Sequence, residues 1–278
     1  MDYKILVDSC TDLPKEIKED SRINSIPLTL MVDDKVFVDN GEFNQGEFLK
    51  IMKESSNSPR SACPSPEDYM KGFNKDGDTF VVTLSSELSG SYNSAELAKR
   101  LYLEENPDKN IEVIDSRSAS VGQTLITMKI REFINQGLKF DEIIQKINAF
   151  RSEMNTKFVL ESLDNLRKNG RLSHLQAIVA NVLNIKPVMG ATPEGTITKL
   201  EQARGIKKAL VTMAKIIESD VIKPQERILG IAHCNCLERA KFIRDEILSR
   251  VPFKDWFIVD TAGVSTMYAN EGGIIVAY

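Results

Sequence analysis

The sequence predicts an α/β protein of two domains, the first of which is built on a parallel sheet. Through residues 1–152, short apolar runs alternate with helical patterns, an order typical of parallel strands joined by helices. Beyond about residue 152 the pattern changes to a helix pair and two strands around a turn. A chain of 278 residues is long enough to bury a large core. We therefore expect an N-terminal α/β domain over 1–152 and a C-terminal α/β domain over 153–278.

In the first half, apolar runs and helix signals follow one another in order. The run at 3–9 predicts a strand, and Asp12 with Pro14 marks the start of a helix. The runs at 23–32 and 35–40 flank Asp33-Asp34 and predict a hairpin. The remaining patterns predict, in order, a helix at 44–55, a strand at 78–85, a helix at about 91–105, a strand at 110–116, a largely buried helix at 120–137 closed by Gly137, and a helix at 139–154.

The second half predicts a different arrangement. Residues 156–162 suggest a strand, and 163–184 suggest a helix pair interrupted by Gly170. Two strands are expected within 185–205, on either side of Pro193-Glu194-Gly195. The chain then alternates between helix and strand, with helices at 207–219 and 237–250 and strands at 227–234, 256–263 and 272–278.

Composition excludes several classes of protein. The net charge of −4 and the absence of a basic cluster argue against nucleic-acid binding. No apolar run approaches the ~20 residues of a membrane-spanning helix, so we expect no stable membrane insertion. The first residues lack the pattern of a secretory signal, and four cysteines are too few for a disulfide scaffold. We therefore expect a cytoplasmic protein with reduced thiols.

Serine and aspartate gather where three predicted strands end. The pairs are Asp8-Ser9, Ser85-Ser86 and Asp115-Ser116, and the carboxyl ends of parallel strands are where open sheets bind ligands. The loop 85–94 adds Gly90 and a helix start, whose free N–H groups attract anions. The alternative is that individual serines cap helices, which we expect for Ser85, Ser86 and Ser94. For the loop as a whole, the sequence favours an anion site for a carboxylate or phosphate.

Catalytic and metal sites are not indicated. The chain has no G-x-S-x-G, S-x-x-K, P-loop or G-x-G-x-x-G motif, and only His174 and His233 can supply an imidazole base. The HCNC stretch at 233–236 lacks the second cluster that a zinc site needs, so a strand end that contains cysteines is the better interpretation. We expect no catalytic residue, no metal and no cofactor.

Six motifs in order resemble the DegV family along most of the chain: VDSCTDLP, RSACPSPEDY, SSELSGSYNSA, VIDSRSASVGQ, LDNLRKNGRLS and LNIKPV. The resemblance implies a two-domain α/β protein that binds a long-chain fatty acid in a buried tunnel between its domains. It also implies a lipid-binding subunit of a fatty acid kinase, which presents the carboxylate to a separate ATP-dependent catalytic subunit and is not itself an enzyme.

The resemblance also implies where the carboxylate binds. The family's two head-group hydroxyls correspond to Ser61 in RSACPSP and Ser89 in LSGSY. Two hydroxyls can each donate one hydrogen bond and so hold both carboxylate oxygens. Gly90, Ser91 and Asn93 are secondary head-group candidates beside Ser89.

Two further positions follow from the same motifs. Arg171 in NGRLS matches the family's Gly-Arg element and is a candidate contact for a phosphate or a partner, with a surface ion pair as the alternative. Many members carry His-x-Gly-Pro-Gly near the C-terminus, where this chain has Tyr268 and Gly272-Gly273. Either the Tyr268 hydroxyl replaces that histidine as another head-group candidate, or the role is absent and the protein buffers, carries or senses lipid.

Two questions stay open at this level. Met31, Ile178, Val182 and Met189 could line the tunnel or form ordinary core. The alternative function is a small-molecule phosphoryl- or acyl-transfer enzyme that uses the loop 85–94 as an anion site. In that enzyme Asp8 or Asp115 would act as base or magnesium ligand, whereas both could equally be helix caps.

Overall fold

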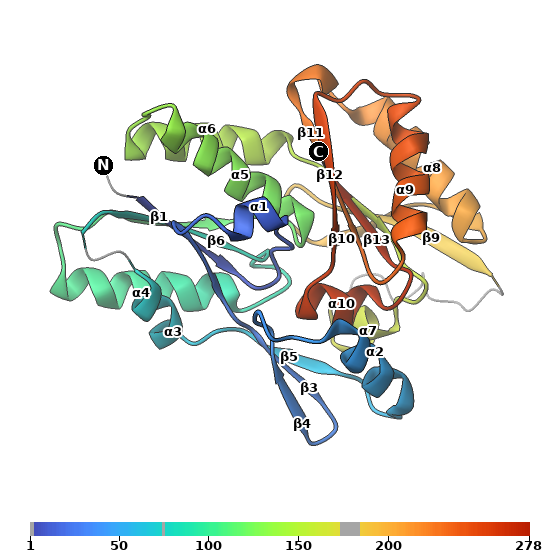
Figure 1. Cartoon of the computed structure of the whole chain (residues 1–278), viewed down its shortest axis with the longest axis horizontal. Helices are drawn as coiled ribbons and strands as arrows, with labels where there is room; N and C mark the ends of the chain where they lie inside the picture. The colour runs from blue at the N-terminus through green and yellow to red at the C-terminus, as the bar shows by residue number, and fades with distance from the viewer. Residues whose placement is uncertain (1–2, 74–75, 173–183) are drawn as a thin grey trace.

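A computed structural model describes residues 3–73, 76–172 and 184–278 (Figure 1). Its first layer is a four-stranded sheet in the order β2-β1-β6-β7, and every pair in it is parallel. The strands are β1 (Tyr3–Asp8), β2 (Ile23–Ile26), β6 (Asp78–Thr83) and β7 (Ile111–Asp115). The parallel sheet predicted for the first half of the chain is therefore confirmed.

The second half forms a six-stranded mixed sheet in the order β10-β9-β8-β13-β11-β12, in which only the β11–β12 pair is parallel. Its strands all follow residue 153, whereas those of the parallel sheet end at residue 115. The domain boundary after residue 152 agrees with this division but stays a prediction. The strands are β8 (Thr156–Val159), β9 (Ile185–Ala191), β10 (Ile197–Arg204), β11 (Ile228–His233), β12 (Asp255–Asp260) and β13 (Ile274–Ala277).

A third, small antiparallel sheet projects from the first half of the chain. It contains β3 (Thr29–Val32), β4 (Lys35–Val38) and β5 (Arg60–Ala62), so the hairpin at Asp33-Asp34 is confirmed. Only the second part of the run at 23–32 takes part in the hairpin, because Pro27 has no N–H for a ladder and the run divides there into β2 and β3. β2 joins the parallel sheet, and β3 joins the hairpin.

Helix α5 lies between the two large sheets and supplies apolar side chains to both. Ile126 and Ile130 pack in the core of the parallel sheet, and Val121 and Leu125 pack against residues of the six-stranded sheet. The prediction of a largely buried helix is confirmed, and Gly137 follows it with a φ of 77°. The helices of this half are α1 (Lys15–Lys18), α2 (Gln45–Glu54), α3 (Pro66–Gly72), α4 (Ser91–Glu105), α5 (Val121–Asn135) and α6 (Phe140–Glu153).

In the second half, α8 and α9 pack their apolar faces on the six-stranded sheet. Of the predicted helix pair at 163–184, the first helix is present, and the second lies mostly outside the described residues. The sequence interpretation missed α3 and α10. The helices here are α7 (Asp164–Lys168), α8 (Ile206–Asp220), α9 (Leu237–Leu248) and α10 (Gly263–Ala269), with a 3-10 turn at Pro224–Glu226. No helix in the described ranges is long and apolar enough to cross a membrane.

Candidate functional site

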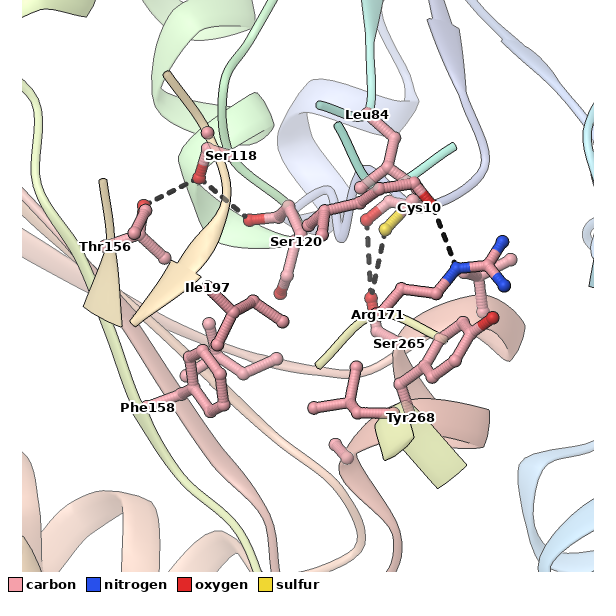
Figure 2. A pocket seen from close by; sticks show the side chains of 18 of the residues that line it. Cys10, Leu84, Ser118, Ser120, Thr156, Phe158, Arg171, Ile197, Ser265 and Tyr268 are labelled. Atoms are coloured by element: carbon pink, nitrogen blue, oxygen red, sulfur yellow. Dashed lines mark hydrogen bonds between the residues drawn. The ribbon is translucent and has the colours of Figure 1, made fainter. Parts of the chain in front are cut away.

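A pocket lies between the two halves of the chain (Figure 2). It has a volume of about 760 Å³, the space at its opening included. Strands of the six-stranded sheet form one wall, loops after β1, β6 and β7 form another, and α10 forms a third. The lining residues are mostly apolar: Cys10, Leu84, Leu88, Ser118, Ala119, Ser120, Thr156, Phe158, Leu160, Leu166, Arg171, Gly190, Ala191, Gly195, Thr196, Ile197, Val264, Ser265, Tyr268, Ala269 and Ile275.

Most hydroxyl groups that line the pocket already form hydrogen bonds within the protein. Ser118 and Thr156, one from each half of the chain, lie 2.6 Å apart between their hydroxyl oxygens. Ser120 donates to the carboxylate of Asp12, and Ser265 donates to the carbonyl of Cys10. These bonds leave the middle of the pocket apolar in character, because hydroxyls already paired present little polarity to a ligand.

One end of the pocket carries a cation and a phenol. The Arg171 guanidinium donates from Nε to the carbonyl of Leu88 at 3.0 Å and lies 6.0 Å from the ring centroid of Tyr268 (Figure 2). The hydroxyl of Tyr268 lies 3.2 Å from the hydroxyl of Ser61 on β5. The structure thus brings together three of the residues that the sequence singled out, although they are far apart in the chain.

Ser89 lies on the loop next to this end. Its hydroxyl accepts the N–H of Ser91 at 3.2 Å, which leaves its own proton uncommitted in the described contacts. A Cβ at Gly90 would lie 3.2 Å from the sulfur of Cys63, so the loop touches the segment that follows β5. Ser61 and Ser89 therefore lie on adjacent segments, although no hydrogen bond joins them.

The other loop candidates have different surroundings. Ser91 is fully buried and donates to Asp8 at 2.7 Å, so its hydroxyl belongs to the core, and Asn93 is exposed on α4. No side chain caps α4, so the capping roles expected for Ser86 and Ser94 are wrong. Ser85 does accept the N–H of Glu87 at 3.3 Å, in the single turn that precedes α4. The hydroxyls of Ser85, Ser86 and Ser94 donate to other segments of the chain, at Gly195, Asp115 and Pro64 respectively.

Asp8 and Asp115 hold loops in place. Asp8 is fully buried, accepts bonds from the N–H of Leu84 and from the side chains of Ser91 and Gln123, and has a pKa raised by burial. Asp115 accepts two bonds from Ser86. Both carboxylates are thus occupied by protein donors, and the described part of the chain holds no cluster of three metal-binding side chains. The magnesium interpretation gains no support, and neither carboxylate caps a helix.

Two of the four predicted tunnel residues, Met31 and Met189, do not line the pocket. Met189 is buried in a core cluster and Met31 lies on the small sheet, so neither lines the pocket. Ile178, Val182 and His174 fall outside the described residues. The nearby thiols of the HCNC stretch, Cys234 and Cys236, have pKa values raised by burial to about 11, which keeps both protonated at neutral pH.

Two buried aspartates that the sequence interpretation did not single out for the site hold the start of α10. Asp39 accepts the N–H of Gly263 at 2.7 Å and that of Val264 at 2.9 Å. Asp12 accepts the N–H of Ala262 at 2.6 Å. Burial raises the pKa of both carboxyls, that of Asp12 to about 6. In the sequence, each of these two aspartates follows a strand-like run and has no basic neighbour. That pattern is the signal that could have indicated a buried carboxylate.

The chain resembles known proteins along its whole length. A family model described as "Uncharacterised protein, DegV family" matches residues 2–278. A DegV domain-containing protein of Streptococcus gordonii is 39% identical and is matched over 100% of this chain and 99% of its own length.

Solved structures agree with the family match. A DegV family protein from Ruminococcus gnavus, refined with vaccenic acid, has a TM-score of 0.98 and 48% identity, and each chain covers 100% of the other. The Streptococcus pneumoniae Fatty Acid Kinase (Fak) B3 protein, loaded with linoleic acid, has a TM-score of 0.92 and 36% identity, with 100% of this chain and 99% of that chain covered. The protein therefore belongs to the DegV family.

Proposed function

We propose that this protein binds a long-chain fatty acid in the pocket between its two halves and presents the carboxylate to a separate fatty acid kinase subunit. The observation that carries the proposal is an apolar pocket whose lining includes Arg171 and Tyr268 at one end, with the Ser61 hydroxyl 3.2 Å from that of Tyr268. The relatives from R. gnavus and S. pneumoniae, which contain vaccenic and linoleic acid, support the same ligand class.

The pocket has the chemistry that a fatty acid requires. Most of its lining residues are apolar, with a few polar side chains among them, as is usual for sites of small ligands. Each methylene moved from water to an apolar wall contributes about 0.8 kcal/mol, so the hydrocarbon chain supplies most of the affinity. A carboxylate does not bind well among such side chains, and it therefore belongs at the end formed by Arg171 and Tyr268.

We assign the carboxylate contacts to Ser61 and Ser89, with Tyr268 as a third hydroxyl. Hydrogen bonds to a charged acceptor are worth about 1.5–3 kcal/mol each, enough to fix the orientation of the head group. The hydroxyl of Tyr268 takes the place of the histidine that many family members carry. Arg171 donates from Nε to the carbonyl of Leu88 and from Nη1 to that of Asn169, and Nη2 bonds to nothing in the described contacts. Arg171 is therefore the candidate for contact with a phosphate or with the partner.

In this proposal the protein is a substrate-binding subunit and carries no catalytic group of its own. The S. pneumoniae relative is named as a component of fatty acid kinase, which supports a kinase partner here. The cytoplasmic location expected from the sequence stays a prediction and suits a partner that uses ATP.

Native mass spectrometry of the purified protein tests the proposal. We expect a C16–C18 acid in near-unit stoichiometry, and rebinding of added vaccenic acid after the lipid is removed. A chain that retains no lipid, even when supplied with it, would contradict the proposal. A thermal-shift assay tests the alternative, because stabilisation of the isolated chain by ATP and magnesium rather than by fatty acid would indicate an enzyme.

A further inference from the structure

We propose that Asp39 is a positioning residue for the carboxylate end of the pocket: it sets the place of the Tyr268 hydroxyl by holding the N-terminus of α10. The inference rests on the proposed function, since it explains how two hydroxyls from distant segments are kept at a separation suited to one carboxylate. Asp39 does not line the pocket and acts only through Tyr268.

The carboxylate of Asp39 is fixed from several directions. Only 3% of the residue is exposed, and its two oxygens accept the N–H groups of Gly263 and Val264. Oδ2 also accepts the hydroxyl of Ser9 at 2.9 Å. No basic side chain bonds to this carboxylate in the described contacts. Its charge is balanced by the free N–H groups of the helix start, where a negative charge is favourable.

The missing side chain of Gly263 makes room for the Asp39 carboxylate. A Cβ on Gly263 would lie 2.6 Å from Oδ1 of Asp39, closer than real Cβ contacts come. Because α10 has seven residues, it is less than two turns long, and Tyr268 lies on its second turn. A shift or rotation at the bonded N–H groups is therefore transmitted directly to Tyr268.

Asp39 and Ser61 belong to the same small sheet. Asp39 follows β4 and donates its own N–H to the carbonyl of Leu28, while Ser61 on β5 pairs with Leu30 on β3. Since β3 pairs with both β4 and β5, the sheet holds the two residues in one frame. The Tyr268 hydroxyl on α10 lies 3.2 Å from that of Ser61. Asp39 is therefore linked to Ser61 in two ways, through the small sheet and through α10.

A double-mutant cycle tests the inference. Asp39→Asn replaces one acceptor oxygen by an amide that faces a backbone N–H, and Tyr268→Phe removes the hydroxyl. With delipidated protein and vaccenic acid as the probe, Asp39→Asn should raise Kd by about tenfold when Tyr268 is present. In the Tyr268→Phe background the same change should raise Kd by less than about twofold, because the hydroxyl through which Asp39 acts is absent.

Asp20→Asn is the matched control, because Asp20 bonds to Arg22 and Arg131 and does not line the pocket. Its effect on Kd should be equal in the two backgrounds. An Asp39→Asn effect that is likewise equal in both backgrounds would overturn the inference. Gly263→Ala disturbs the same contact from the helix side. If Asp39→Asn fails to fold, the effect of Gly263→Ala on Kd is compared in the same two backgrounds instead.

A measurement without lipid separates this inference from the proposed function. The ¹⁹F spectrum of protein labelled with 3-fluorotyrosine contains a Tyr268 signal, identified by its loss in Tyr268→Phe. We expect Asp39→Asn or Gly263→Ala to shift that signal in the unliganded protein, whereas Asp20→Asn leaves it in place. An unmoved signal in both test variants would overturn the positioning role even where lipid binds. A wild-type protein that binds no lipid would instead overturn the proposed function.

Discussion

At the scale of single residues, the proposed carboxylate end of the pocket combines one full charge with neutral donors. Arg171 supplies the charge and packs over the ring of Tyr268, while Ser61 and Ser89 supply hydroxyls from neighbouring segments. A planar guanidinium stacks on an aromatic face in a way that a lysine cannot reproduce. The arrangement favours a planar anion such as a carboxylate over a neutral ester or alcohol of the same chain length.

Ser89→Ala should weaken binding of vaccenic acid by about 1–2 kcal/mol, because a charged acceptor loses one donor. Isothermal titration of delipidated protein measures the change in Kd. Ser94→Ala is the control on the same segment, since the Ser94 hydroxyl donates to the carbonyl of Pro64 at 2.6 Å. An unchanged affinity for Ser89→Ala, or an equal loss for Ser94→Ala, would remove Ser89 from the head-group contacts.

At the scale of elements, the sequence was informative where a segment is long and its apolar pattern regular. The helix at Ser91–Glu105 has the predicted bounds, and the pair β9 and β10 turns at Pro193-Glu194-Gly195 as expected. The failures are short elements. β5 has three residues with no apolar alternation, and α10 consists of GVSTMYA, in which glycine, serine, threonine and valine are poor helix formers. Asp39 and Asp12 hold α10 by tertiary contacts, which local propensity does not report.

The sequence likewise predicted part of the candidate site: its polar residues but not its apolar wall. Ser61, Ser89 and Arg171 lie in motifs, whereas Tyr268 stands where the family's histidine motif is missing. The structure places Arg171 and Tyr268 at one end of the pocket and Ser61 and Ser89 beside it. The apolar wall was not predictable, because a side chain such as Phe158 faces the pocket only by virtue of the order and register of six strands. Met189 is as apolar as Phe158, yet it is buried in a core cluster and does not line the pocket.

Gly122, in the first turn of α5, shows how closely the elements pack at the junction of the two halves. A Cβ there would lie 1.9 Å from the hydroxyl of Ser118, which bonds to Thr156. Gly122→Ala should therefore destabilise the protein by about 1–3 kcal/mol in urea unfolding. Gly46→Ala is the matched control. Gly46 lies in the first turn of α2, where a Cβ would make an ordinary contact of 3.7 Å with Asn44 Oδ1, so this change should stabilise the protein by up to about 1 kcal/mol. Equal effects of the two changes would argue against close packing at Gly122.

At the scale of the whole molecule, the two halves are joined by polar contacts around the pocket as well as by α5. Ser85 donates to the carbonyl of Gly195, and Asp12 in the first half accepts the N–H of Ala262 in the second. Asp12 is 1% exposed, and its pKa is raised by burial from 3.8 to about 6. At a pH between these two pKa values, Asp12 is mostly protonated in the folded protein and mostly ionised in the unfolded chain.

The contribution of Asp12 to the free energy of unfolding should therefore be present in full below about pH 4 and lost as pH rises through 6. At 1.36 kcal/mol per pKa unit, the difference between wild type and Asp12→Asn should fall by about 2 kcal/mol from pH 4 to pH 7. Urea unfolding of both proteins at intervals of half a pH unit measures it. A difference that stays constant over this range, or that rises with pH, would contradict the buried position of Asp12.

The position of Cys63 gives the molecule a built-in place for a reporter. Cys63 is exposed beside Gly90, whereas Cys10 and Cys234 are buried and Cys236 is partly buried. A maleimide dye should therefore attach first at Cys63, close to the segment that carries Ser89. Occupancy of the pocket could then be followed by fluorescence in the unmutated protein, in real time, as lipid arrives from vesicles and leaves to an acceptor.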